Sequence, residues 1–160
     1  MKFGLNVAFA CIVGLVSLLN CSSKPIEDIP TIANEGQWRM MTKTWEVHLV
    51  LVSSMLEEKC ADCKAFHEKF TELADAVEGV IASKVLIDKP GGIAMGWKLD
   101  LTIENIPAIV LVSQEQDYGI KIWGKNDDFS VEQMKDSISS YLAANEYIPE
   151  LKKYRKLPAV

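Results

Sequence analysis

Two cysteines separated by two residues stand where the expected structure of this chain changes from strand to helix. Before them, residues 45–52 (WEVHLVLV) are β-rich and almost wholly apolar towards their end, which predicts a buried central strand. After them, apolar residues recur every three or four positions over 61–77, which predicts a helix with one buried face. Cys60 and Cys63 therefore lie at the start of a helix that follows a buried strand. This placement restricts the chain to folds that are built around a β-α unit.

The remaining patterns continue the alternation of helices and strands. In order, they predict a helix over 34–43, a strand over 80–87, a turn over 88–92, a helix over 93–99, a strand over 108–112, a turn over 114–117, a strand over 118–123 and a helix after Ser130. The strands that flank the long helix should be parallel through a right-handed crossover. The last two strands are close enough for an antiparallel hairpin. The expected fold is α/β, with a mixed sheet of four to five strands and helices on both faces.

The first 21 residues have the layout of an export signal. Lys2 precedes an apolar run over 3–19, and small or polar residues follow. An uncleaved membrane anchor is the alternative, although the run falls short of the ~20 residues that span a bilayer. Residues 18–21 (LLNC) resemble a bacterial lipobox, in which Cys21 would be lipidated. Ordinary cleavage after Cys21 or Ser23 is the other reading of these residues.

The chain thus divides into four parts. We expect a signal peptide over 1–21, a tether over 22–33, a folded domain over 34–145 and a basic tail over 146–160 that forms a loose helix or strap. In a bacterium the product would be periplasmic or a cell-envelope lipoprotein that Cys21 tethers to the membrane. In a eukaryote it would be secreted or stay in the secretory pathway. The net charge of -5 gives no electrostatic basis for binding nucleic acid.

The cysteine count assigns the chemistry to one pair. Of the four cysteines, Cys11 leaves with the signal, and Cys21 is lipidated, removed or unpaired. No second pair then remains for a structural disulfide. Free N–H groups at a helix N-terminus stabilise a thiolate on Cys60. Cys63 lies one turn further along, where it can attack a mixed disulfide on Cys60, so we expect Cys60 to be the exposed attacking thiol and Cys63 the buried resolving thiol.

The chain resembles the thioredoxin family over about residues 34–145. The residues that carry the resemblance are 60–64 (CADCK), 85–88 (VLID), 97–99 (WKL), 103–108 (IENIPA) and Gly124. The resemblance implies the thioredoxin fold and a thiol-disulfide oxidoreductase with Cys60 and Cys63 as its catalytic pair. It also implies that Pro107 is cis, lies against the disulfide and, with Ile106 before it, presents backbone to the substrate chain.

The sequence departs from the family pattern around the cysteines. Family members usually have Trp before the first Cys, where this chain has Lys59, and the dipeptide between the cysteines is Ala61-Asp62. The buried acid of thioredoxin, which helps to move the proton of the second Cys, falls on Ser54 in an ungapped alignment. Glu57 or Glu58 could take its place, although both are expected to be more exposed.

Lys59 and Asp62 are expected to tune the pKa of the Cys60 thiol in opposite directions. A carboxylate beside Cys60 should raise that pKa and an ammonium should lower it, with both effects screened by solvent. Strong oxidants of the family place His or a comparable electropositive group between the cysteines. Because this chain has Ala61-Asp62 there, we expect a reducing protein, nearer to thioredoxin at ~-270 mV than to DsbA at ~-120 mV.

These observations predict an enzyme that reduces or isomerises disulfides of exported proteins. Its partners would be proteins with disulfides or thiols and an electron donor, and the prediction includes no cofactor and no metal. One alternative is a client-binding module of the same fold with slow or no turnover. Another is a metal-binding protein in which His67 joins the cysteines, but His48 lies inside a strand and a fourth ligand is missing. Outside that alternative, His67 is expected to face solvent on its helix.

Overall fold

The computed structural model describes residues 25–44, 46–113, 119–143, 145–148, 150 and 153–156. The predicted signal peptide, with Cys21, and the predicted turn over 114–117 lie outside the described residues. Within the described part of the chain, no helix has the length and apolar character to cross a membrane.

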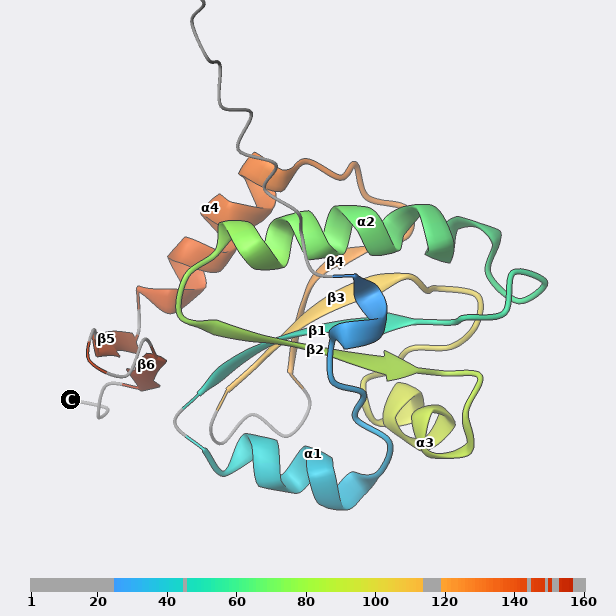
Figure 1. The fold of residues 1–160 in the computed structure, drawn as a ribbon, viewed down its shortest axis with the longest axis horizontal. Coiled ribbons are helices and arrows are strands. Elements are labelled where there is room, and N and C mark those ends of the chain that lie inside the picture. The colour runs from blue at the N-terminus through green and yellow to red at the C-terminus, as the bar shows by residue number, and fades with distance from the viewer. Residues whose placement is uncertain are drawn as a thin grey trace, which may run out of the picture.

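Four strands form one mixed sheet in the order β2-β1-β3-β4 (Figure 1). The central strand β1 (Val47–Ser53) pairs in parallel with β2 (Val80–Leu86) and antiparallel with β3 (Ala108–Val112). β3 in turn pairs antiparallel with β4 (Ile120–Gly124). The predicted mixed sheet, its parallel first pair and its antiparallel hairpin are all confirmed.

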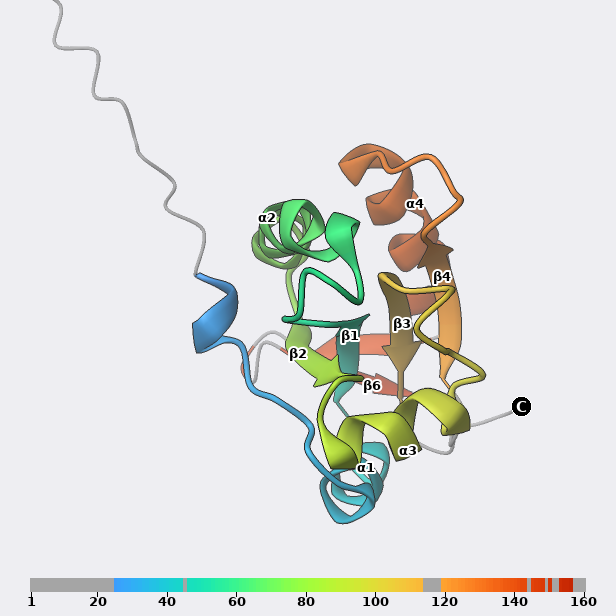
Figure 2. The same ribbon diagram turned by 90° about the vertical axis from the view of Figure 1, so that its right-hand side faces the viewer.

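Helices cover both faces of this sheet, as Figure 2 shows from the side. α2 (Ala61–Ala76) and α4 (Val131–Leu142) lie on one face, and α1 (Glu35–Thr42) and α3 (Pro90–Lys98) lie on the other. Every residue of β1 is consequently buried. Alternate side chains of a strand point to opposite faces, so Leu49 and Leu51 belong to one core cluster while Val50 and Val52 belong to the other.

Residues 25–32 lie against the domain, although the sequence predicts a tether over 22–33. Three isoleucines of this segment are buried: Ile26, Ile29 and Ile32. Two of them flank or belong to the 3-10 helix η1 (Ile26–Asp28), and backbone hydrogen bonds of 2.8 and 2.9 Å join residues 30–32 to Lys84 of β2. The segment therefore pairs with the edge of the sheet. The two prolines suggested a tether, and the isoleucine at every third position was the signal against it.

The C-terminal residues also differ from the prediction of a loose helix or strap. β5 (Asn145–Ile148) and β6 (Lys153–Lys156) form a separate antiparallel pair. Tyr147 and Tyr154 stand at opposite positions in its register. Tyr and Ile favour strands over helices, which accounts for a hairpin where the basic residues alone suggested a solvated tail.

α3 begins earlier than predicted, at Pro90 instead of Ile93. Proline suits the first turn of a helix because its missing N–H has no partner there in any case. Gly92, expected in a turn, lies inside this first turn, and a Cβ on it would come within 1.8 Å of the carbonyl oxygen of Leu86. Close approach of two backbones, and not a turn, is what requires glycine at this position.

Candidate functional site

The two cysteines lie at the N-terminus of α2, where the sequence predicts them. Cys60 is the N-cap residue of the helix, and it forms a disulfide with Cys63, with the two Cα atoms 5.4 Å apart. Cys63 has no exposed surface, whereas Cys60 keeps 6 % of its surface exposed. The predicted order of exposure holds, but Cys60 is covered far more than expected. Of these two cysteines, only Cys60 keeps surface that another protein can contact.

Ile106 and Pro107 lie beside the pair, 46 residues along the chain from Cys60. The Sγ atom of Cys60 is 3.7 Å from the carbonyl oxygen of Ile106. The Ile106–Pro107 peptide bond is cis. β3 begins directly after Pro107 and runs antiparallel to β1, so the start of β3 meets the end of β1, where Cys60 follows. The order of the strands in the sheet thus brings Ile106 and Pro107 next to the cysteine pair.

A smaller cavity, of about 290 Å³, lies on the Pro107 side of the pair. Pro107, Trp123 and Asp62 contribute to its lining. Asp62 has 71 % of its side chain exposed, and its Oδ2 atom lies 3.9 Å from Nζ of Lys125. Lys59 is exposed as well. Both groups expected to tune the thiol are therefore in solvent, which screens their charges.

The loop that joins β1 to α2 is fixed by hydrogen bonds. The Met55 N–H donates to Oδ1 of Asp88 at 3.0 Å, which connects the loop to the end of β2. The Leu56 N–H donates to Oγ of Ser54 at 3.0 Å, and the Cys60 N–H donates to the Leu56 carbonyl at 3.1 Å. These contacts hold the backbone that enters the helix and so position Cys60.

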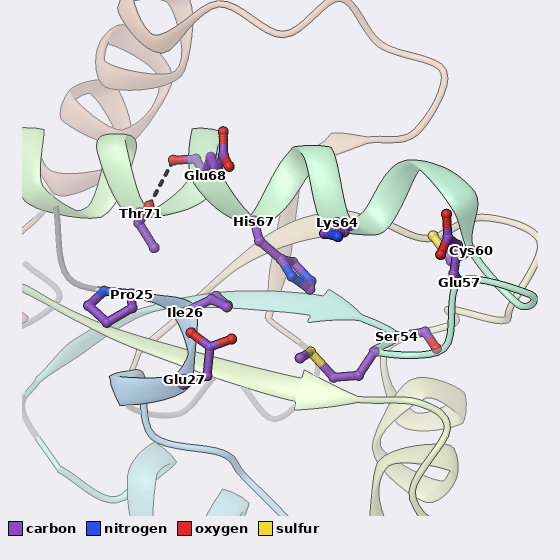
Figure 3. Close-up of a pocket in the computed structure, with 11 residues that line it drawn as sticks. Pro25, Ile26, Glu27, Ser54, Glu57, Cys60, Lys64, His67, Glu68 and Thr71 are labelled. Atoms are coloured by element: carbon purple, nitrogen blue, oxygen red, sulfur yellow. Dashed lines mark hydrogen bonds between the residues drawn. The ribbon is translucent and has the colours of Figure 1, made fainter.

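A larger cavity, of about 500 Å³, borders Cys60 on the other side. It lies between α2, η1 and the loop after β1, and its lining includes Glu57, Lys64 and His67 (Figure 3). Figure 3 shows His67 extending from α2 towards β1, with Cys60 at one end of the cavity and Ile26 at the other. The cavity therefore connects the reactive pair to the segment that the sequence assigned to a tether.

The expected substitutes for the buried acid of thioredoxin remain at the surface. Glu57 and Glu58 are both exposed, as predicted. Ser54 is buried, with 2 % of its surface exposed. Of Ser54, Glu57 and Glu58, only Ser54 is buried, so a hydroxyl group stands where thioredoxin has its buried acid.

His67 is buried, with 6 % of its surface exposed, and the prediction of a solvent-facing residue is corrected. Its Nε2 atom lies 2.6 Å from Oγ of Ser53. Burial lowers the pKa of His67, and the nearby Lys84 lowers it further, whereas Glu27 opposes the shift. The helical spacing of the sequence indicates this burial, because His67 precedes the buried Phe70 by three residues and so borders the apolar face of α2.

Among the described residues, no group of three or more His, Cys, Asp and Glu is arranged to hold a metal ion. His48 lies in β1 one residue before Leu49, which faces α2, so His48 belongs to the opposite face of the sheet from His67. The two histidines cannot join the cysteines in one site.

No protein-family model matches the chain, and no curated protein sequence matches it. Solved structures do resemble it. Mitochondrial thioredoxin 3 from Saccharomyces cerevisiae, in its oxidised form, is 20 % identical with a TM-score of 0.58, and the match covers 73 % of this chain and 99 % of that one. The J-Trx1 fragment of ERdj5 is 16 % identical with a TM-score of 0.56, covering 71 % of this chain and 49 % of that chain. Oxidised thioredoxin O2 from Arabidopsis thaliana is 16 % identical with a TM-score of 0.51, covering 70 % and 92 %. The predicted thioredoxin fold is confirmed.

Proposed function

We propose that this chain, which has the thioredoxin fold, is a thiol-disulfide oxidoreductase that reduces or isomerises disulfides of exported proteins. The observation that carries the proposal is the Cys60–Cys63 disulfide at the start of α2, in which Cys60 alone keeps exposed surface. The fold and the cysteine pair together support thiol-disulfide exchange in general. The signal-like residues 1–21 support export.

The exchange proceeds in two steps from the reduced protein. The Cys60 thiolate, stabilised by the N-terminus of α2, attacks a client disulfide and forms a mixed disulfide, and one client sulfur leaves as a thiolate. Cys63 then attacks Cys60, which releases the second client sulfur and forms the intramolecular disulfide. The client gains two electrons and two protons. An external dithiol reductant restores Cys60 and Cys63 to the thiol form.

Ile106 and Pro107 are the residues that we assign to client binding. The Ile106 carbonyl lies 3.7 Å from Sγ of Cys60, the attacking sulfur, so a client chain that reaches Cys60 must pass this backbone. Pro107 lines the adjacent cavity. An extended client segment beside Cys60 would therefore contact both residues.

The reducing direction rests on the dipeptide between the cysteines. Ala61 and Asp62 place no positive group next to Cys60, and extra stabilisation of the thiolate is what makes a strong oxidant. Lys59 is the nearest cation in sequence, and its exposure limits its effect on the thiol.

Replacing Cys63 with Ser tests the proposal. We expect Cys63→Ser to accumulate mixed disulfides with exported proteins at least about tenfold over the wild-type chain, because Cys60 still attacks and no thiol resolves the product. The measurement is non-reducing electrophoresis of the full chain from cells that export it, after acid quenching, with mass spectrometry of the adducts.

The matched control is Cys60→Ser with Cys63 intact, which should form no adducts through Cys63 because Cys63 has no exposed surface. Adducts through Cys63 would reverse the assignment of the two thiols. Adducts with cytosolic proteins only would contradict the assignment to exported clients.

A further inference from the structure

His67 lies one helical turn after Cys63 on the same side of α2. Residues four apart on a helix are neighbours, with Cβ atoms about 5–6 Å apart. Cys63 has no exposed surface, so water at neutral pH is a slow proton acceptor for its thiol. Resolution of a mixed disulfide nevertheless requires the thiolate. We propose that His67 accepts the proton of the Cys63 thiol in the resolving step, an inference that rests on the proposed oxidoreductase function.

The contact between His67 and Ser53 bears on which ring nitrogen can accept the proton. Oγ of Ser53 lies 2.6 Å from Nε2 of His67, and either atom can be the donor. Our proposal uses the tautomer in which Nε2–H donates to Ser53, whose own proton can point to the Ser54 carbonyl 3.4 Å away. In that tautomer Nδ1 is unprotonated. Among the described residues Nδ1 has no hydrogen-bond partner.

The cavity beside Cys60 gives the proton a path out. His67 and Cys60 line the same cavity of about 500 Å³, and Figure 3 shows the imidazole of His67 extending into it. A proton taken from Cys63 therefore arrives on a ring that borders the space next to the departing client sulfur. Neither exposed acid in the loop before Cys60 has this combination of burial and contact with the cavity.

Charged groups surround the ring on each element that packs against it. They are Lys84 on β2, Glu27 on η1, Lys64 and Glu68 on α2 and Glu57 in the loop after β1. Burial is the largest influence, and with Lys84 it lowers the pKa of His67 below its usual value, although Glu27 raises it. His67 is therefore neutral at neutral pH, which is the state that a proton acceptor needs.

The step balances in protons and electrons. The Cys63 proton moves to Nδ1 of His67, which leaves a thiolate and an imidazolium. The thiolate attacks Sγ of Cys60, the bond between Cys60 and the client breaks, and the Cys60–Cys63 disulfide forms. The client sulfur leaves with the electron pair of the broken bond as a thiolate. The imidazolium then passes its proton through the cavity to that thiolate, and neutral His67 is restored.

His67→Gln separates proton transfer from packing, because glutamine can still bond to Ser53 but cannot take up a proton. We mix the reduced full chain, with Cys11→Ser and Cys21→Ser in every protein compared so that Cys60 and Cys63 are its only thiols, with 5,5′-dithiobis(2-nitrobenzoate) in a stopped-flow instrument. The first release of the coloured thiol reports attack by Cys60, and the second reports resolution by Cys63. Near pH 6.5 we expect the variant to slow the second release at least about tenfold, within the range of general-base effects. Near pH 9.5, where hydroxide removes the proton, the difference should fall below about twofold.

His48→Gln is the matched control, since His48 is equally buried but lies on the opposite face of the sheet. It should leave both releases at the wild-type rate. Equal second-release rates in His67→Gln and wild type near pH 6.5 would overturn the proposal, as would a slowing of the same size at every pH, which would mark a structural role. His67→Asn carries the same expectations if the glutamine variant does not fold. A wild-type chain that releases no coloured thiol would instead refute the proposed function.

Discussion

Replacing Cys60 with Ser is expected to slow the reaction of the reduced protein with a small aromatic disulfide by at least about 1000-fold, or about 4 kcal/mol in activation free energy. A serine hydroxyl stays protonated at neutral pH, and the thiolate is the nucleophile in disulfide exchange. Cys63 cannot replace it, because it has no exposed surface. The measurement is the rate of the first thiol release in a stopped-flow instrument, near pH 7, with Cys11→Ser and Cys21→Ser in every protein compared so that only the pair contributes thiols.

Cys63→Ser is the control for this loss, because it removes a sulfur one helical turn away and leaves Cys60 intact. It should retain the first thiol release within about threefold, since Cys60 attacks without help from the second thiol. A Cys60→Ser protein that reacts within tenfold of the wild type would show that Cys63 is the attacking residue.

Gly92→Ala is expected to lower the free energy of unfolding by about 3 kcal/mol, at the upper end of typical overpacking costs. The added Cβ would lie 1.8 Å from the carbonyl oxygen of Leu86 and 2.5 Å from its carbonyl carbon. Both neighbours are backbone atoms of the β2 strand, so α3 must move away from the sheet to relieve the clash. Urea unfolding followed by circular dichroism measures the change.

Gly124→Ala is the matched control for that clash. A Cβ on Gly124 would be 3.4 Å from Nζ of Lys121 and 3.5 Å from Oδ2 of Asp127, both at the ends of flexible side chains. Its free energy of unfolding should stay within about 1 kcal/mol of the wild type. Equal stability of Gly92→Ala and the wild type would contradict the close approach of α3 to the end of β2.

The sequence was sufficient to predict the centre of the site because its signals are local. An apolar run of strand residues, a change to helical period and the C-x-x-C between them placed Cys60 and Cys63 at the start of α2. The position of Ile106 and Pro107 beside Cys60 depends on sheet order. No local pattern encodes that order, and it was the family resemblance that supplied it.

Other parts of the site depend on contacts between distant segments. In the sequence, residues 25–32 resemble a linker. Their isoleucines are buried because the segment pairs with the edge strand β2. His67 is polar by type, but Ser53 supplies its partner and η1 covers the space next to it. Early entry into α3 at Pro90 likewise depends on how closely the helix approaches Leu86. For residues 25–32 and for His67, burial comes from a neighbour that is remote in sequence.

The acids in the loop before Cys60 are the opposite case, because their exposure could be predicted from the sequence. The sequence predicts that Glu57 and Glu58 are more exposed than the buried acid of thioredoxin, and both are at the surface. The loop before Cys60 has no regular spacing of apolar residues. The exposure of its acids could therefore be predicted from their polarity. What composition could not show is that His67, from the next helix, is buried and lines the cavity that Cys60 borders.

Redox equilibration of Cys60 and Cys63 tests the central claim most directly. The full chain is equilibrated with a series of glutathione buffers, quenched with acid and alkylated, and the dithiol and disulfide forms are quantified by mass. We predict complete and reversible two-electron interconversion, with a potential nearer to ~-270 mV than to ~-120 mV. A potential near ~-120 mV would contradict the reducing direction. A Cys60–Cys63 pair that stays in one state across the whole series would contradict the exchange activity itself.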